Sequence, residues 1–254
     1  MIRLKTEKEI KTMREGGKRH AEILREVAKK VAPGVSTKEL NELAYKLIKK
    51  GGDKPAFLNY TPEGVSYPYP ASLCVSINDE VVHGIPNAKV FLEDGDIVSL
   101  DLGLVHKGLI TDGAITIPCG KISKEAKELI KVTKKALDLA IKAAKPGNTT
   151  GDIGHAVESF IKPLGYGIVK ILSGHGVGYE VHEDPYVPNY GKPGTGEKLV
   201  PGMVIAIEPM VNLGKGEVCV TDDEYTYITK DGKISAHFEH TIAITKKGAD
   251  VLTK

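Results

Sequence analysis

Apolar residues recur with a helical period along much of the chain. Between Thr6 and Val31 they fall about 3.6 residues apart, which predicts one amphipathic helix that stops before Pro33-Gly34. Ser36 then offers an N-cap, and a second helix with its apolar positions on one face follows and ends at Gly51-Gly52. The first 50 residues are therefore expected to form a helix pair.

The same pattern returns 113 residues later, where Pro146-Gly147 is followed by Thr149 as Pro33-Gly34 is followed by Ser36. A helix over Ser123–Ala144 precedes this second break, and another helix follows it. Each half thus has the order helix, break, helix, strands. The pattern predicts an internal duplication with halves of about 1–118 and 119–254, related by a pseudo-two-fold axis within a single domain of residues 1–254.

Strands are expected after each helix pair. This order favours an α+β protein in which helices pack on one face of an antiparallel sheet. Two related halves would meet in a pseudo-symmetric cleft, a common place for an active site. The predicted strands are 73–77, 97–105, 109–118, 203–211, 218–220, 225–229 and 235–245.

Composition places the chain among ordinary globular proteins, with 41% hydrophobic and 27% charged residues. A net charge of +2 gives no indication of nucleic acid or of an anionic membrane as a partner. Charged residues follow Met1 at once, and no apolar run reaches membrane-spanning length, so neither a secretory signal nor a membrane segment is expected. Cys74, Cys119 and Cys219 form no Cys-x-x-Cys pair, which favours a reducing cytoplasm.

Seven acid and imidazole side chains in the C-terminal two thirds carry the candidate chemistry. Most lie in apolar, Gly-rich segments expected to be buried, where an unpaired carboxylate costs several kcal/mol or becomes neutral. Two divalent cations would be the simplest compensation, because four carboxylates with one or two imidazoles match their ligand preferences. The seven are His83, Asp101, Asp112, His175, His182, Glu208 and Glu239.

Two of the acids, Asp101 and Asp112, lie on strands joined by the turn His106-Lys107-Gly108. Symmetric pairing about this turn predicts that Asp101 and Asp112 are direct cross-strand neighbours, with Cβ atoms roughly 5 Å apart. Such a pair needs either a shared proton or a cation between the carboxylates. Two unrelated, solvent-facing aspartates are the alternative that the hairpin alone leaves open.

The remaining candidates come from four further segments. Glu208 and Glu239 each stand in an otherwise apolar strand, and His175 lies between two glycines that allow close backbone approach. His182 follows from the same loop, and His83 comes from the other half of the chain. None of these residues is decisive alone, but together with the aspartates they form a convergent acidic set that a metal or protonation makes tolerable.

The ordered motifs resemble those of type I methionine aminopeptidases over essentially the whole chain. The resemblance implies the pita-bread fold, in agreement with the duplication. The short interval of 31 positions from Glu208 to Glu239 leaves no room for the helical insertion of type II relatives. The motifs are Cys74-Val75-Ser76-Ile77-Asn78, His83-Gly84-Ile85-Pro86, Ser99-Leu100-Asp101-Leu102-Gly103, Thr111-Asp112-Gly113, Gly174-His175-Gly176-Val177-Gly178 with His182-Glu183, Ile207-Glu208-Pro209-Met210, and Phe238-Glu239-His240-Thr241.

The resemblance also implies two divalent metal ions and a hydrolytic mechanism. Asp101 would hold one metal, Asp112 and Glu239 would bridge both, and His175 with Glu208 would complete the second site. A metal-generated hydroxide would attack the first peptide bond, while Glu208 shuttles a proton. Two histidines would contact the substrate. His182 would contact the developing oxyanion, and His83 would contact the scissile nitrogen. One imidazole among carboxylates suits Mn, Fe or Co at least as well as Zn.

By position, the family's methionine pocket maps to Tyr69, Cys74 and Tyr225, where a flexible thioether would pack. Three features depart from the family pattern. Val181 stands where an aromatic residue is usual, Tyr225 stands where tryptophan is common, and 66–69 replaces a turn richer in glycine. None of these positions is an implied metal ligand, so the departures bear on pocket shape rather than on catalysis.

The expected activity is removal of the N-terminal methionine from nascent proteins with a small second residue. The expected partners are N-terminal Met peptides, the expected state is a monomer, and transient ribosome association is an expectation from the family only. Two alternatives have the same fold. One is an Xaa-Pro peptidase, although those relatives usually carry an added N-terminal domain. The other is a non-catalytic peptide- or ribosome-binding protein, although such relatives lose metal ligands.

Overall fold

Two helix pairs, each followed by strands, lie along the chain in the predicted order, but six short strands were not predicted, among them the one that carries His175. The computed structural model describes residues 1–254. The helices are α1 (Glu7–Ala28), α2 (Thr37–Lys50), α3 (Lys124–Ala143) and α4 (Thr150–Ile161), with the 3-10 turn η1 (Lys162–Leu164). The strands are β1 (Lys54–Pro55), β2 (Leu73–Ile77), β3 (Glu80–Val82), β4 (Ile97–His106), β5 (Leu109–Pro118), β6 (Gly167–Ile168), β7 (Gly174–Gly176), β8 (Glu183–Val187), β9 (Val204–Ile207), β10 (Met210–Asn212), β11 (Val218–Val220), β12 (Tyr227–Thr229), β13 (Ser235–His237), β14 (His240–Thr245) and β15 (Gly248–Val251).

Each helix begins at a hydroxyl residue that caps its first turn. The side chains of Thr6, Ser36, Ser123 and Thr149 each accept a hydrogen bond from the backbone three residues later. In three of the four an acid at that third position bonds back to the capping residue, which completes a capping box. The predicted N-caps at Ser36 and Thr149 are confirmed.

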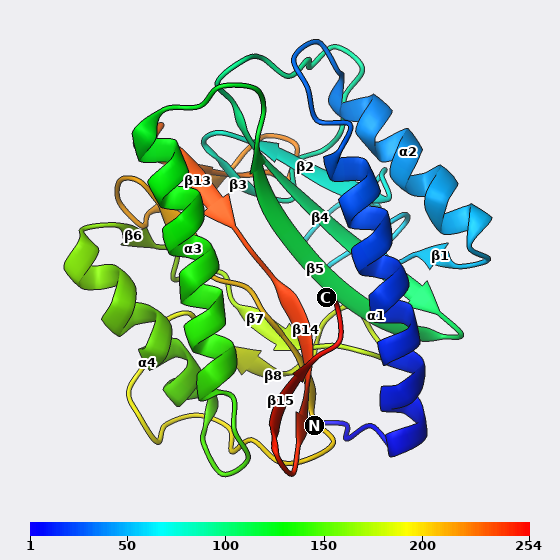
Figure 1. The fold of residues 1–254 in the computed structure, drawn as a ribbon, viewed down its shortest axis with the longest axis vertical. Helices are drawn as coiled ribbons and strands as arrows, with labels where there is room; N and C mark the ends of the chain where they lie inside the picture. The colour runs from blue at the N-terminus through cyan, green and yellow to red at the C-terminus, as the bar shows by residue number, and fades with distance from the viewer.

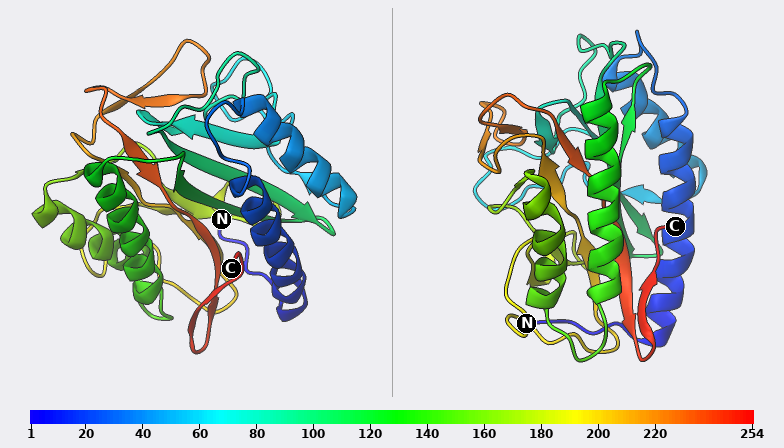
Figure 2. Two further views of the ribbon diagram at one scale, coloured as in Figure 1. Left: turned by 45° about the horizontal axis from the view of Figure 1, so that its top comes forward. Right: turned by 60° about the vertical axis from the view of Figure 1, so that its left-hand side comes forward.

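The two helix pairs flank strands that pass between them (Figure 1). Figure 1 places α1 and α2 on one side and α3 and α4 on the other, with β4, β5, β13 and β14 in between, and Figure 2 shows the same layers from two further directions. One apolar core cluster lies under α1 and α2 against β2 and β4. A second joins α3 and α4 to β9, β10 and β14, so each half of the chain has its own core.

Matching hydrogen bonds in the two halves repeat the duplication seen in the sequence. The amide of Gly34 donates to the carbonyl of Leu92 at 2.7 Å, and the amide of Gly147 donates to the carbonyl of Leu199 at 2.9 Å. Both glycines have φ in the left-handed region, +86° and +93°, which glycine adopts without strain. The Pro-Gly breaks therefore make the same turn before α2 and before α4.

The hairpin between β4 and β5 closes through a two-residue turn. His106 pairs with Leu109, so only Lys107 and Gly108 form the turn, with φ of 49° and 83°. Positive φ at both central residues is the geometry of a type I′ hairpin, whose twist matches that of the strands. The three-residue turn assumed from the sequence is therefore wrong.

This turn shifts the register of the two aspartates. Asp101 pairs with Ala114, and Asp112 pairs with Gly103, so Asp101 and Asp112 are diagonal rather than direct cross-strand neighbours. A two-residue shift keeps both side chains on the same face of the sheet because side chains alternate with a period of two. The prediction of direct pairing is wrong, whereas the prediction that both face one side holds.

Two predicted strands are each divided in two, and each division falls at a candidate acid. Segment 203–211 becomes β9 and β10 on either side of Glu208, and segment 235–245 becomes β13 and β14 on either side of Glu239. β9 and β14 belong to the five-stranded sheet β15-β14-β9-β7-β8, whereas β10 and β13 belong to the sheet β13-β10-β6. Both segments thus pass from one sheet to another at the acid.

Backbone chemistry accounts for the two divisions. Pro209 has no N–H to donate to a ladder, so a strand cannot continue through it undisturbed. The amide of Glu239 instead donates to the carbonyl of Ala114 on β5 at 2.9 Å. Because Ile207 pairs with His240 on one side of the break, Glu208 and Glu239 lie opposite each other.

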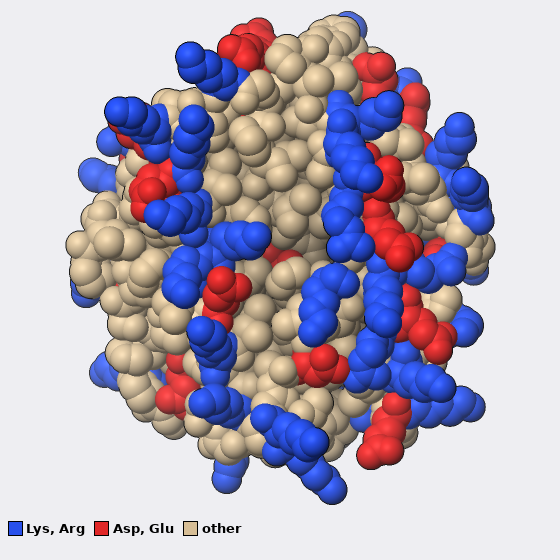
Figure 3. Space-filling model, in the orientation of Figure 1, with Lys and Arg blue, Asp and Glu red and all other residues tan.

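Lysine and arginine side chains form two bands over the helices, and the upper part of the surface between the bands is largely uncharged (Figure 3). The exposed lysines of α3 include Lys124, Lys127, Lys131 and Lys134. Their position agrees with the solvated helix faces expected from the sequence. No helix combines the length and the apolar composition needed to cross a membrane.

Candidate active site

All seven acid and imidazole residues singled out in the sequence line one cavity. The three residues proposed for a side-chain pocket line the same cavity, as does Val181, together with three residues that the sequence did not suggest. The full lining is Phe57, Tyr60, Pro62, Tyr69, Cys74, His83, Asp101, Asp112, His175, Val181, His182, Glu208, Tyr225 and Glu239. Residues from both halves of the chain therefore share the site.

The aspartates are fixed by the ladders of the first half and by one threonine of the second. Asp101 lies in the middle of β4, opposite Cys74 of β2, and is buried. The amide of Asp112 donates to Thr241 Oγ1 at 2.8 Å, and the Thr241 hydroxyl donates to the carbonyl of Asp112 at 2.7 Å. This reciprocal pair ties β5 to β14 at the residue that carries the carboxylate.

His175 faces the acids with a defined ring nitrogen. Its Nδ1 lies 2.9 Å from the carbonyl of Gly176, which can only accept, so Nδ1 carries the proton. Burial lowers the pKa of His175 to about 3, so the imidazole is neutral and its Nε2 has a free lone pair. That Nε2 lies 3.5 Å from Glu208 Oε1.

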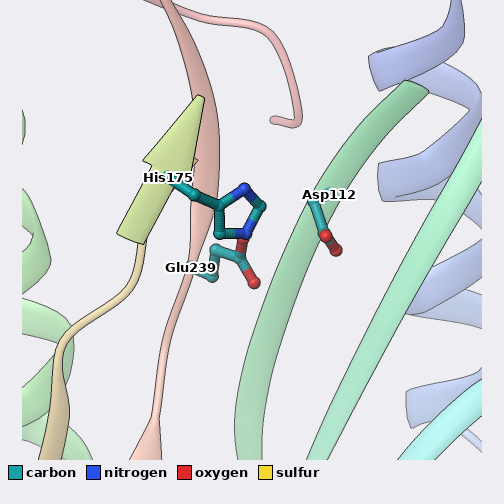
Figure 4. A group of neighbouring side chains, drawn as sticks. All are labelled: Asp112, His175 and Glu239. Carbon is teal, nitrogen blue, oxygen red and sulfur yellow. The ribbon is translucent and has the colours of Figure 1, made fainter. Parts of the chain in front are cut away.

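Three side chains from three different elements converge in the cavity (Figure 4). Asp112 comes from β5, His175 from β7, and Glu239 from the segment before β14. One ligand atom of each lies within 4.8 Å of the others. Two atoms that each lie about 2 Å from one ion are at most about 4 Å apart, so a small movement of these side chains would let one ion contact all three.

The four carboxyl groups of the cavity have no basic partner. Burial raises the pKa of Asp101 to about 7 and that of Glu208 to about 8. Burial, together with the neighbouring carboxylates, also raises the pKa of Asp112 and Glu239 well above the ordinary range. Among the ion pairs of the structure, only imidazoles approach these acids. The cavity therefore lacks positive charge.

The donor set fits divalent cations. Asp101 Oδ1 and Glu239 Oε1 are buried without a hydrogen-bond partner, which leaves each as a free acceptor inside the cavity. Oxygen donors with a single imidazole suit ions such as Mn, Fe, Co or Zn. Burial now favours the protonated, neutral form of these carboxyl groups, and cations at this position would stabilise the ionised form instead.

His182 and His83 lie apart from the four acids. The ring of His182 packs edge-on to that of His175, with centroids 4.5 Å apart, and His182 is exposed to solvent. Its Nδ1 lies 2.8 Å from the hydroxyl of Tyr60, a residue that the sequence did not suggest. His83 has φ of 61°, which is uncommon for a residue other than glycine and aims its side chain into the cavity.

Aromatic rings form one wall of the cavity. The ring of Tyr225 packs edge-on against Tyr69 at 5.1 Å and against Tyr67 at 5.2 Å. Tyr69 is buried, and its hydroxyl donates to the carbonyl of Gly84 at 2.9 Å. Val181 also lines the cavity. The three departures from the family pattern therefore meet at this wall.

The sequence did not single out one further residue of the site, His237. This histidine is 1% exposed, and its Nε2 lies 3.6 Å from Glu208 Oε2 and 3.9 Å from Glu239 Oε2. A signal was available, because His237 stands two residues before Glu239 in the same predicted strand. Tyr60, Phe57 and Pro62 come from an irregular loop and gave no comparable signal.

Comparison with known proteins assigns the chain to a family of metal-dependent peptidases. Residues 11–246 match the model of metallopeptidase family M24. Methionine aminopeptidase 1 of Bacillus subtilis is 46% identical over 254 residues, and the match covers 100% of both proteins. Methionine aminopeptidase of Aquifex aeolicus is 47% identical over 256 residues, covering 100% of this chain and 99% of its own length.

Solved structures show the same architecture. The crystal structure of methionine aminopeptidase from Thermotoga maritima has a TM-score of 0.96 at 46% identity and covers 100% of both chains. The prolidase of Pyrococcus horikoshii has a TM-score of 0.79 at 27% identity, and only 63% of its chain is covered. These likenesses confirm the predicted α+β pita-bread fold. The chain belongs to the methionine aminopeptidases of metallopeptidase family M24.

Proposed function

We propose that this chain removes the N-terminal methionine from proteins whose second residue is small, using two divalent metal ions. The observation that carries the proposal is the cavity itself, in which four unpaired carboxyl groups and one neutral imidazole adjoin an aromatic wall. The relatives that match the full chain are named methionine aminopeptidases, which supports the same activity here.

In this proposal Asp101 would hold one metal, Asp112 and Glu239 would be shared between the two, and His175 with Glu208 would complete the second site. The unpartnered oxygens of Asp101 and Glu239 support this arrangement, as does the Nε2 lone pair of His175. When bound, divalent ions lower the pKa of a water toward about 7 and so supply a nucleophile at neutral pH.

His182 is suited to stabilise the oxyanion that develops on the scissile carbonyl. If the Tyr60 hydroxyl donates to Nδ1 of His182, the neutral ring carries its proton on Nε2 and can donate it toward the substrate. His83 enters the cavity from the first half of the chain and would contact the scissile nitrogen. Glu208 would carry a proton from the nucleophile to the leaving amine while remaining a ligand.

Specificity for methionine would come from the wall formed by Tyr69, Cys74 and Tyr225. All three line the cavity and are buried, and Val181 adds a smaller apolar surface. A thioether side chain is flexible and polarizable, so it packs well against aromatic ring edges. Cys74 stands directly opposite Asp101, which places this wall beside the proposed metals.

The cellular setting follows from the same proposal. Nascent chains supply N-terminal methionine in the cytoplasm, and a transient contact with the ribosome would bring the enzyme to them. Cys74, Cys119 and Cys219 are all free thiols, as expected in a reducing compartment. We expect the chain to act as a monomer because each half supplies part of one cavity.

Peptide cleavage tests the proposed specificity. The metal-loaded protein should release methionine from Met-Ala-Ser and leave both Met-Leu-Ser and an Ala-Pro peptide largely intact. The Ala-Pro peptide distinguishes this activity from that of the Xaa-Pro peptidases of the same fold. Faster cleavage of Ala-Pro than of Met-Ala-Ser would reject the proposal in favour of that activity.

A further inference from the structure

His237 is held rigidly behind the acids of the cavity. It is the last residue of β13 and pairs with Met210 of β10. Its amide donates to Thr116 Oγ1 at 2.8 Å, and the hydroxyl of Thr116 donates to the carbonyl of His237, also at 2.8 Å. The backbone of His237 is thus fixed to β5 on one side and to β10 on the other.

The imidazole of His237 has no hydrogen-bond partner although it is buried. It is 1% exposed, and neither Nδ1 nor Nε2 is satisfied. A buried polar group without a partner is costly and rare in native proteins, so the unsatisfied imidazole calls for an explanation. Two carboxylate oxygens lie within 4 Å of its Nε2: Oε2 of Glu208 at 3.6 Å and Oε2 of Glu239 at 3.9 Å.

The two oxygens of Glu208 face two different imidazoles. Oε1 lies 3.5 Å from His175 Nε2, on the cavity side, whereas Oε2 lies 3.6 Å from His237 Nε2. His175 lines the cavity and His237 does not, so the glutamates stand between His237 and the cavity. This placement suits a residue that acts through the carboxylates, and it does not suit a direct metal ligand.

We propose that His237 is a positioning residue that donates its Nε2 proton to Glu208 and Glu239 and so orients both carboxylates toward the metals. The inference rests on the proposed metal site. A neutral imidazole has one N–H, and at 3.6 and 3.9 Å both carboxylate oxygens lie beyond hydrogen-bond distance, so the proposal requires the carboxyl groups to turn toward His237 when the metals bind. Contacts that orient metal ligands typically contribute 10–100-fold to metal affinity.

Two substitutions separate this role from simple packing. His237→Gln keeps an N–H donor at similar reach, whereas His237→Leu keeps a similar volume without a donor. His155→Leu, at an exposed histidine of α4, is the matched control. Calorimetric titration of each metal-free protein with Mn²⁺ measures affinity and stoichiometry without relying on catalysis.

We expect His237→Leu to weaken Mn²⁺ binding by about 10–100-fold. His237→Gln should stay within about threefold of the unsubstituted protein, and His155→Leu should not differ from it. Unchanged affinity in His237→Leu would overturn the proposal. Equal losses in the Gln and Leu variants would also overturn it, because the ring itself would then be required, as a ligand or for packing.

Folding and function are checked separately. Circular dichroism establishes whether each variant folds. If His237→Leu does not fold, His237→Asn replaces it, because the shorter amide of asparagine cannot reach the glutamates. We expect His237→Asn to weaken Mn²⁺ binding as much as His237→Leu. Unsubstituted protein that binds no Mn²⁺ would overturn this proposal together with the metal chemistry. Protein that binds Mn²⁺ but spares Met-Ala-Ser would contradict only the proposed function, and the comparison of variants would stand.

Discussion

Asp112 links several parts of the proposed site through its side chain and its backbone. Its carboxylate lies within 4.8 Å of ligand atoms of His175 and Glu239, and its backbone is tied to Thr241. In Asp112→Asn the amide keeps the shape but removes the charge that two cations would share. We expect at least one metal per chain to be lost, and activity on Met-Ala-Ser to fall at least about 100-fold.

Elemental analysis of the purified variant measures this loss. Asp138→Asn, at an exposed position of α3, is the control and should keep the full metal content. An Asp112→Asn protein with the same metal content as the unsubstituted chain would refute the bridging role of Asp112.

The raised pKa values of the carboxyl groups predict how the metal-free protein responds to pH. Glu208, with its pKa raised to about 8, and Asp101, raised to about 7, keep protons in the folded state that they lose in the unfolded state. Stability from these groups is present at low pH and is lost as pH rises through the folded-state values. Unfolded histidines have a pKa near 6.5 and still bind protons below about pH 7.5, so the buried neutral imidazoles oppose this trend at lower pH and cease to do so above about pH 7.5.

The free energy of unfolding of the metal-free protein should therefore fall by at least about 1 kcal/mol between pH 7.5 and 9. Urea unfolding at several pH values measures the change. With excess Mn²⁺ the fall should disappear, since the metal binds the deprotonated carboxylates. A metal-free protein whose stability is constant or increases over this range would show that the acids are already ionised.

The sequence was sufficient to find most of the site residues, but not their immediate neighbours. An acid in an apolar strand, such as Glu208 or Glu239, is recognisable because its burial conflicts with its charge. His237 lies in such a strand too, but a buried neutral histidine creates no such conflict. Tyr60 reaches His182 from an irregular loop, and no periodicity predicts the path of a loop.

At the scale of elements, caps and periodicity predicted the helices, but turn chemistry was misjudged. Lys107-Gly108 alone makes the β4–β5 turn, because both residues take positive φ. Because His106 was counted as part of the turn, the predicted cross-strand partner of Asp101 was Asp112, two residues away from its actual partner Ala114. The divisions at Glu208 and Glu239 depend on long-range pairing with β5 and on Pro209, which a strand pattern within one segment does not reveal.

A buried ion pair fastens the N-terminal segment to the turn that carries His182. Lys5 Nζ lies 2.6 Å from Glu183 Oε2, and both side chains are almost completely buried. The other oxygen of Glu183, Oε1, accepts a hydrogen bond from the amide of Tyr179, which ties the turn together. The same oxygen lies 3.3 Å from the guanidinium of Arg3. Removing one partner of a buried pair leaves an uncompensated charge and typically costs 3–5 kcal/mol.

Lys5→Met should accordingly reduce the free energy of unfolding by about 3 kcal/mol, toward the lower end because Arg3 compensates in part. Urea unfolding of the metal-loaded protein measures the loss. Lys29→Met is the matched control, because it removes one partner of the exposed pair with Glu26 and should change stability by less than about 0.5 kcal/mol. Similar small effects of the two substitutions would show that the N-terminal segment is not fastened in solution.

At the scale of the whole molecule, the duplication explains how the site is assembled. Asp101 and Asp112 come from the first half, whereas His175, Glu208 and Glu239 come from the second. The halves meet where β5 bonds to the segment around Glu239, so neither half alone contains the cavity. We therefore propose that residues 1–254 act as one catalytic unit.

The central claim is that peptide cleavage depends on metal ions bound by the five residues of this cavity. The most direct measurement removes the metal with a chelator, adds Mn²⁺ or Co²⁺ back stepwise, and follows methionine release from Met-Ala-Ser together with the metal bound per chain. We expect no cleavage without metal and restored cleavage as the ions bind, up to two per chain. Full cleavage by protein shown to be free of metal would contradict it.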